Sequence, residues 1–282
     1  MTTIFLYRNS NLEGSKHIAI GIRDYLRNHN VKVVVEKSES ETLESDTLSS
    51  VDPKEIDFVI TLGGDGTILR YMHNYPDYNI PVIGVNLGSL GFMADLVVTD
   101  IYPSLSNLLD GKFCIQERLM MRGVASDGKE CSSVNDFTFH RASIPSLVEL
   151  AIHVDGSYLN TFSGDGVIFA TPCGSTAYSL GAGGPILTPN LEAFILTPIC
   201  PHTISNRPIV LMPEQEIQIQ YTSLHDPIEV HSDGIFIGKL KTGDIFRLTP
   251  SKKKFRLVTL PQTDYFSTLR CKLGWSGKSK KL

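Results

Sequence analysis

The residues with the clearest chemical potential form a glycine-rich turn, Gly63-Gly-Asp-Gly66, with one carboxylate inside it. An apolar-rich run, 57–62, leads into the turn, and 67–72 follows with the look of a helix. Glycines without a Cβ let a phosphate approach the backbone N–H groups, and the start of a helix adds the positive end of its dipole. Asp65 gains nothing from a phosphate, so its carboxylate suits a metal ion or a hydroxyl group. The pattern predicts phosphoryl transfer.

A second cluster, residues 171–185, combines four glycines with the hydroxyl groups of serine, threonine and tyrosine side chains. Small hydroxyls can hydrogen-bond phosphate or ribose without filling a pocket, and Tyr178 can stack on a base or another ring. A tight β-turn is the structural alternative, although such a turn seldom needs so many glycines and hydroxyls together. The cluster is therefore predicted to be a binding loop.

The elements around these motifs have two different textures. Up to about residue 110, strand-like and helix-like segments alternate, which predicts a Rossmann-like α/β domain with a parallel sheet. Between 112 and 260, short β-branched and aromatic runs separated by turns predict an all-β sandwich. The expected domains are 1–110 and 111–261, with 262–282 able to pack back on the first. The acidic, serine-rich stretch 36–52 is expected to be a mobile surface segment.

Composition excludes several classes of function. The 282 residues, 41% hydrophobic and 20% charged, suit a soluble globular protein, and the net charge of -4 gives no support to a binder of nucleic acid or anionic membranes. The sequence contains no uncharged apolar run of about 18 residues, so no transmembrane helix is predicted, and no secretory signal is expected. Five scattered cysteines without C-x-x-C spacing favour a cytoplasmic location and argue against disulfides or a zinc site.

Taken together, the motifs resemble those of the NAD kinase family. The matching segments, in the family's order and spacing, are 63–67, 134–140, 164–166 and 171–178, with later signatures at 201–208 and 265–275. Diacylglycerol and sphingosine kinases carry a similar Gly-Gly-Asp-Gly-Thr motif, so segment 171–178 is the discriminating one. The resemblance spans nearly the whole chain from about residue 57. It implies an α/β domain joined to a β-sandwich.

The resemblance also implies roles for single residues. Asp65 is expected to be the catalytic carboxylate beside the ribose 2′-hydroxyl, Asn135 and Asp136 match an Asn-Glu pair that contacts the dinucleotide, and Asp165 matches an aspartate on the NAD side. The remaining expected nucleotide-binding residues are Gly63, Gly64, Gly66, Thr67, Arg70, Thr176, Ala177, Tyr178, Ser179, Leu180 and Gly181. For Arg70, a solvated helix face is an equally good interpretation.

Two residues depart from the family pattern, and two segments allow two readings. Asp136 is one methylene shorter than the usual glutamate, so its contact needs a backbone adjustment or a bridging water. Ser163 stands where some bacterial members carry an arginine. Segment 86–92 is either part of the crevice at the strand ends or a plain connection. Asp233-Gly234 resembles a family site near the substrate, but an ordinary β-turn fits equally well.

The implied activity is transfer of the γ-phosphoryl group of ATP to the 2′-hydroxyl of the adenosine ribose of NAD, giving NADP. Mg²⁺ or another divalent metal is expected to arrive with ATP, since no metal cage is visible. Asp165 is expected to favour the positively charged ring of NAD over NADH. The expected assembly is a homodimer or homotetramer, without nucleic-acid or membrane partners. A lipid kinase and a non-catalytic NAD-binding sensor stay open as alternatives, as do other phosphoryl donors and regulation by NADP or NADPH.

Overall fold

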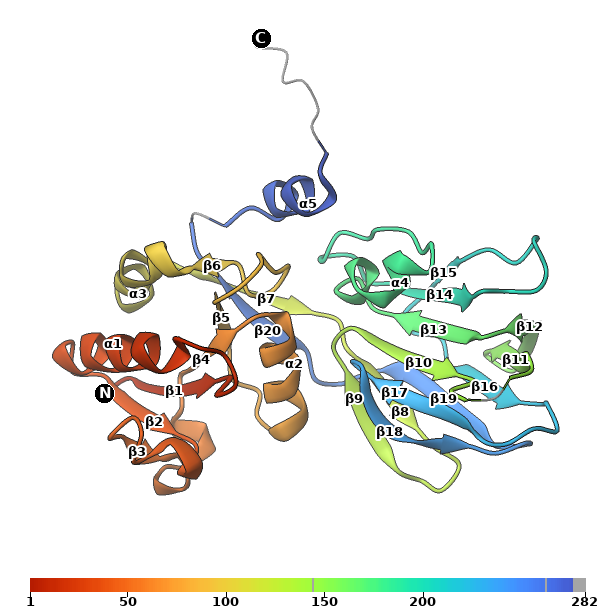
Figure 1. Cartoon of the computed structure of the whole chain (residues 1–282), viewed down its shortest axis with the longest axis horizontal. Coiled ribbons are helices and arrows are strands. Elements are labelled where there is room, and N and C mark those ends of the chain that lie inside the picture. The colour runs from red at the N-terminus through yellow and green to blue at the C-terminus, as the bar shows by residue number, and fades with distance from the viewer. Residues whose placement is uncertain (144, 262, 276–282) are drawn as a thin grey trace, which may run out of the picture. The chain divides into compact units, whose positions relative to one another are not determined.

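The computed structural model describes residues 1–143, 145–261 and 263–275 (Figure 1). These form two compact units, one of Met1–Glu117 with the described part of Arg256–Leu282, and one of Arg118–Phe255. The first contains a parallel sheet with helices, and the second contains antiparallel sheets alone apart from short helical turns. The predicted fold class, an α/β domain followed by an all-β domain, is confirmed.

The α/β unit is built on one eight-stranded sheet, in the order β3-β2-β1-β4-β5-β20-β7, with β6 pairing on β5. Its strands are β1 (Thr3–Arg8), β2 (Lys32–Val35), β3 (Asp46–Thr47), β4 (Phe58–Gly63), β5 (Val82–Asn86), β6 (Leu96–Val97), β7 (Cys114–Arg118) and β20 (Phe255–Thr259). Since β2 and β4 lie on opposite sides of β1, the strand order reverses there. In open parallel sheets, ligands bind at the carboxyl ends of the strands beside such a reversal.

Helices of the α/β unit join or follow these strands. They are α1 (Ser15–Asn28), α2 (Asp65–Asn74), α3 (Ile101–Leu109) and α5 (Tyr265–Leu273), with single 3₁₀ turns η1 (Lys37–Glu39), η2 (Leu48–Ser50), η3 (Pro53–Glu55) and η4 (Val98–Asp100). In α1, Ile18, Ile22 and Leu26 recur every four residues, as expected for the apolar face of a helix; Ile22 and Leu26 are buried, and Ile18 packs at the margin of the core. Residues 262 and 276–282 of the predicted C-terminal segment lie outside the described residues.

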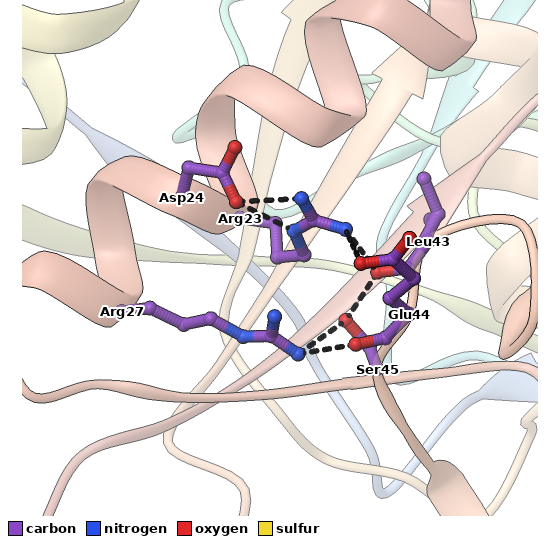
Figure 2. Close-up of polar contacts among 6 residues, drawn as sticks. All are labelled: Arg23, Asp24, Arg27, Leu43, Glu44 and Ser45. Carbon is purple, nitrogen blue, oxygen red and sulfur yellow. Dashed lines mark hydrogen bonds and ion pairs between the residues drawn. The ribbon is translucent and has the colours of Figure 1, made fainter.

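Segment 36–52 packs onto the α/β unit, which differs from the mobile surface segment that its composition predicted. Leu43 is fully buried in the core, and β3 pairs in parallel with β2. Arg23 donates from Nη1 to the Leu43 carbonyl oxygen at 2.6 Å, and Arg27 donates from Nη2 to the Glu44 carbonyl oxygen at 2.6 Å; Figure 2 shows both contacts. The buried side chain of Leu43 and the bonds from two arginines to the backbone of Leu43 and Glu44 therefore hold this segment in place, although its composition is polar.

The second unit contains two six-stranded sheets, ordered β15-β14-β13-β10-β17-β18 and β12-β11-β16-β19-β8-β9. The first holds β10 (Asp136–His140), β13 (Gly166–Ala170), β14 (Phe194–Ile199), β15 (Ile209–Leu211), β17 (Ile228–Ser232) and β18 (Ile235–Leu240). The second holds β8 (Met121–Val124), β9 (Glu130–Ser133), β11 (Val148–Val154), β12 (Ser157–Gly164), β16 (Ile217–Tyr221) and β19 (Ile245–Pro250). Alternate residues of both sheets, such as Phe139 and Ile219, form one core.

Candidate functional site

The Gly63–Gly66 turn joins β4 to α2 at the carboxyl end of the parallel sheet. At Gly63 a Cβ would lie 2.0 Å from the Oγ1 of Thr67, so only glycine fits beside that buried side chain. At Gly64 and Gly66 a Cβ would meet no atom within 4 Å. The Thr67 side chain therefore packs against the turn at Gly63. Gly64 and Gly66 leave open space beside the backbone of the turn.

Asp65, the first residue of α2, is held by the loop that follows β5. Its Oδ1 accepts hydrogen bonds from the backbone N–H groups of Met93 at 3.0 Å and Ala94 at 2.7 Å, and its Oδ2 accepts from Phe92 at 2.8 Å. A Cβ on Gly91 would lie 2.1 Å from Oδ1, which explains the glycine there. The loop thus fixes the orientation of the carboxylate.

Segment 86–92 had two readings from sequence, and the contacts of its end favour the crevice. Asn86 shapes its start, because its Nδ2 donates to the Ser89 carbonyl and its Oδ1 accepts from Gly88, both at 2.8 Å. The contacts to Asp65 begin at Phe92 and continue beyond the segment. Sequence reasoning missed the backbone groups of 93–94. The only signal for them was a glycine-rich loop after a strand.

Arg70 lies exposed on α2, and its Nη1 is 3.4 Å from the Oδ1 of Asn9, which follows β1. The backbone N–H of Asn9 donates to the carbonyl of Leu62 at 2.9 Å, so the connection after β1 lies beside the end of β4. Arg70 thus places an exposed guanidinium group near the point where the strand order reverses, whereas the Arg8 guanidinium at the end of β1 is bonded to Glu39 and Ser15.

In the all-β unit, Asn135 and Asp136 lie in a turn that the carboxylate of Asp233 holds. Asp233 accepts from the backbone N–H groups of Val134 at 3.0 Å, Asn135 at 2.6 Å and Asp136 at 3.2 Å, and from the Ser133 hydroxyl at 2.6 Å. Its own backbone is left-handed, with φ of 51°, which aspartate tolerates. Asp233-Gly234 is therefore a turn that also supports the Asn135–Asp136 pair.

The two side chains of that pair keep unused hydrogen-bonding capacity. Asn135 is 8% exposed, and its buried Oδ1 has no hydrogen-bond partner among the described residues. Asp136 is 5% exposed, and burial, followed by the charge of Asp233, raises the pKa of its carboxyl to about 7. Thr138 donates its hydroxyl to the Oδ1 of Asp136 at 3.2 Å. Buried polar groups are almost always paired, so the Asn135 oxygen is a candidate acceptor for a ligand donor.

The binding loop 171–185 packs directly against this turn. The Thr171 hydroxyl donates to the Val134 carbonyl at 2.6 Å, and its backbone N–H donates to the Asn135 carbonyl at 2.8 Å. A Cβ on Gly174 would lie 2.1 Å from the same Asn135 oxygen, so this glycine permits close approach of the two segments. The structure therefore brings the predicted loop and the predicted pair together.

Side chains of the loop divide into buried and exposed groups. Ser175 is fully buried and donates to the Pro172 carbonyl at 2.6 Å, and the Ser179 hydroxyl is paired with that of Thr197 at 2.8 Å. These hydroxyls serve the fold of the loop. Thr176, Ala177 and Leu180 are half-buried, and Gly181 is exposed, within η5 (Gly174–Thr176) and α4 (Tyr178–Gly181) or between them. Tyr178 is 47% exposed and presents the aromatic surface.

Asp165 forms an ion pair that the sequence did not reveal. The Nε of Arg141 donates to its Oδ1 at 2.6 Å, and the Arg141 backbone N–H donates to the Asp165 carbonyl at 2.9 Å. The pKa of Tyr178 is raised, first by burial and then by the negative charges of Cys200, Asp165 and Asp136. Asp165 therefore acts electrostatically on the same tyrosine as Asp136, with an arginine beside it although position 163 is serine.

Two family models match the chain, the ATP-NAD kinase N-terminal domain over residues 5–113 and the ATP-NAD kinase C-terminal domain over residues 134–260. The chain belongs to the ATP-NAD kinase family. An NAD kinase of Protochlamydia amoebophila is 52% identical over 277 residues, covering 98% of this chain and 99% of the relative. An NAD kinase of Syntrophotalea carbinolica is 35% identical, with 98% and 99% covered.

Solved structures of NAD kinases share the fold. A yeast NADH kinase complexed with NADH gives a TM-score of 0.88 at 25% identity, covering 100% of this chain and 90% of that chain. An NAD kinase from Archaeoglobus fulgidus in complex with ATP gives 0.76 at 25% identity, covering 98% and 100%. The predicted family is confirmed, and the chain is an enzyme of the NAD kinase type. The lipid-kinase and sensor alternatives are not favoured.

Within residues 1–143, 145–261 and 263–275, no helix is long and apolar enough to cross a membrane. The same ranges contain no group of three or more His, Cys, Asp or Glu side chains that could hold a metal ion.

Proposed function

We propose that this chain transfers the γ-phosphoryl group of ATP to the 2′-hydroxyl of the adenosine ribose of NAD, and that Asp65 orients this hydroxyl. The observation that carries the proposal is the hold of three backbone N–H groups on Asp65, at the end of a glycine turn suited to phosphate. Membership of the NAD kinase family supports the same reaction.

The hydrogen bonds of Asp65 indicate which of its oxygens meets the substrate. Among the described residues, Oδ1 accepts two backbone N–H groups, from Met93 and Ala94, whereas Oδ2 accepts only one, from Phe92. A carboxylate oxygen accepts about two hydrogen bonds, so Oδ2 has room for one more. We assign that place to the ribose hydroxyl. In a loose transition state the proton leaves late, so orientation of the attacking oxygen is the main contribution.

Phosphate binding falls to the backbone of the turn. The N–H groups near Gly64 and Gly66 and the start of α2 provide partial positive charge at a point where an added Cβ would meet no atom within 4 Å. Arg70 is placed to add a full charge at the same strand ends. Mg²⁺, or another divalent metal, would arrive with ATP and neutralise the transferring phosphoryl group. Because Asp65 has room for only one further contact, phosphate oxygens and water suit this ion as ligands.

The dinucleotide side of the proposal rests on the all-β unit. The Oδ1 of Asn135, which has no partner in the described part of the chain, is an acceptor for a ligand N–H or O–H donor, and Asp136 follows it directly. The exposed ring of Tyr178 offers a stacking surface of the kind that aromatic side chains give to bases. Thr176, Ala177, Leu180 and Gly181 line the same loop. The internal bonds of Ser179 assign it a supporting role in that loop.

One assay tests the reaction. Purified protein is incubated with ATP and Mg²⁺ and with either NAD or diacylglycerol, and NADP and phosphatidate are measured. Formation of NADP alone supports the proposal. Phosphorylation of diacylglycerol would indicate a lipid kinase, and NAD binding without turnover would indicate a sensor. Replacing ATP by polyphosphate in the same assay tests the donor, for which ATP is expected because no cluster of lysines and arginines lies near either motif.

The assembly and location are proposed on separate grounds. We propose a homodimer or homotetramer from the family resemblance, and light scattering that finds only the monomer mass would contradict it. All five cysteines are free, which supports a reducing, cytoplasmic location.

A further inference from the structure

Phe92 links the loop that holds Asp65 to the C-terminal helix α5. Its backbone N–H donates to the Oδ2 of Asp65 at 2.8 Å. Its ring centroid lies 6.2 Å from that of Tyr265, with the planes at 46°, and the Nζ of Lys272 lies 5.7 Å from the same centroid. One residue therefore contacts the carboxylate through its backbone and α5 through its side chain.

Tyr265 and Lys272 are suited to hold this ring together. They are the first and the next-to-last residues of α5, seven positions apart, so two helical turns bring them to the same face. The aromatic pair has the separation and tilt typical of favourable ring contacts, and the lysine lies within the range of a cation–π interaction. The Phe92 ring is half-buried, which strengthens both contacts relative to a fully solvated ring.

The helix α5 is itself well fixed at both ends. Asp264 caps its start by accepting from the backbone N–H groups of Phe266 at 3.2 Å and Ser267 at 3.0 Å. Gly274 ends it in the left-handed conformation, with φ of 63°. Leu269 is buried, with 5% of its surface exposed. The loss of one contact to Phe92 is therefore not expected to unfold α5.

The other side of the connection is equally tight. Gly91 donates its backbone N–H to the Ala94 carbonyl at 3.1 Å, which closes a short turn around Phe92 and Met93. A Cβ at Gly91 would lie 2.1 Å from Asp65 Oδ1 and 2.9 Å from the Ala94 oxygen. Little space exists between turn and carboxylate. A shift of the Phe92 ring therefore shifts the N–H group bonded to Oδ2, the oxygen assigned to the ribose hydroxyl.

We propose that Phe92, Tyr265 and Lys272 are positioning residues for phosphoryl transfer, through which α5 sets the orientation of the Asp65 carboxylate. This inference rests on the proposed role of Asp65. It assigns the C-terminal helix a part in the chemical step, although none of the three side chains touches the reacting atoms. Because these residues are proposed to act on turnover, variants that lack them should show a lowered kcat with little change in the KM values for ATP and NAD.

The first test uses four single variants of the full chain. Tyr265→Ala and Lys272→Met are each expected to lower kcat about 3- to 10-fold, with KM for both substrates within about twofold of the parent. Tyr265→Phe keeps the ring and should keep kcat. Arg270→Met is the control, because it removes the same charge from the last turn of α5 and, among the described residues, the ion pair of Arg270 is with the exposed Asp264 at 3.8 Å, whereas the cation over the Phe92 ring is Lys272. Lys272 is exposed, so its variant is expected to fold, as a thermal melt would verify.

The second test asks whether the effect passes through Asp65. Tyr265→Ala is combined with Asp65→Asn, and the residual turnover is compared with that of Asp65→Asn alone. If α5 acts on the carboxylate, the second change adds little, whereas an equal fold-loss in both backgrounds would overturn the inference. Parent-like kcat in both Tyr265→Ala and Lys272→Met would overturn it as well. A parent protein that makes no NADP would instead contradict the proposed function, so the two failures are distinct.

Discussion

Two aspartates in different units of the molecule accept clusters of backbone N–H groups to opposite effect. Asp65 accepts three N–H groups and retains room for one more contact at Oδ2. Asp233 accepts three N–H groups and a hydroxyl, three of the four at Oδ1. In the first case the backbone fixes a carboxylate, and in the second a carboxylate fixes a backbone. The difference teaches that the number of hydrogen bonds does not by itself distinguish the two roles: Asp65 is held by a separate loop after β5, whereas Asp233 holds the turn that carries Asn135 and Asp136.

The largest effect is expected from Asp65→Asn. The amide keeps the size of the carboxylate, but it removes the charge and places an N–H donor where one oxygen now accepts. We expect kcat to fall by at least about 100-fold with little change in NAD affinity. Steady-state kinetics and calorimetry measure the two quantities. Asp110→Asn, at an exposed carboxylate paired with Lys112, is the matched control. Near-normal turnover in Asp65→Asn would remove Asp65 from the reaction.

Asp233→Asn should act on binding and stability more than on turnover. An amide cannot accept from all four donors, so buried N–H groups around Asn135 lose partners, at a cost of about 1–3 kcal/mol of unfolding free energy. We expect a lower melting temperature and weaker NAD binding, with kcat much less affected than in Asp65→Asn. The opposite pattern, a large loss of kcat with unchanged NAD affinity, would mean that Asp233 takes part in the reaction, and it would contradict the difference in role between Asp65 and Asp233.

The raised pKa of Asp136 gives a pH-dependent test of the burial of this carboxyl, with the charge of Asp233 as the second cause of the shift. Its carboxyl pKa is raised from 3.8 to about 7, so the folded state binds this proton more tightly than the unfolded state. The contribution to stability is therefore most favourable below pH 3.8 and is lost as pH rises toward 7. The change Asp136→Asn should raise the melting temperature relative to the parent at pH 8, and this advantage should shrink at lower pH. A difference in melting temperature between Asp136→Asn and the parent that does not vary with pH would contradict the raised pKa of Asp136.

The smallest effect is expected at a third carboxylate, that of Asp165. Its partner is the Arg141 side chain, whereas the carboxylates of Asp65 and Asp233 accept from backbone N–H groups. Arg141→Gln removes the partner charge, so Asp165 should attract the positive ring of NAD more strongly. We expect the ratio of kcat/KM for NAD over NADH to rise about fivefold, equivalent to about 1 kcal/mol, and to fall in Asp165→Asn. Kinetics with both redox forms measure it. A ratio unchanged in both variants would show that these charges do not discriminate the ring.

The sequence predicted the features that depend on local pattern. Alternating textures indicated the parallel sheet and the β-sandwich, and Gly63–Gly66 marked the phosphate turn after β4. It did not predict partners brought together by the fold. The bonds from 92–94 to Asp65 span 27 to 29 residues, and that between Asp165 and Arg141 spans 24. Ser175 and Ser179 read as ligand-binding hydroxyls because burial has no local signature in a loop rich in small residues.

The position of β20 has a consequence for how the protein is made. The chain leaves the α/β unit at Glu117 and returns to it at Arg256, and β20 then pairs in parallel with β5 through Leu257 and Val82. During synthesis the all-β unit is therefore complete before the first unit is. Until the returning strand emerges, β6 covers this edge of β5 only at Val85 and Asn86, and the edge near Val82 still lacks the strand that pairs with it in the complete unit. A nascent or truncated chain that ends before β20 is thus the form most prone to aggregate.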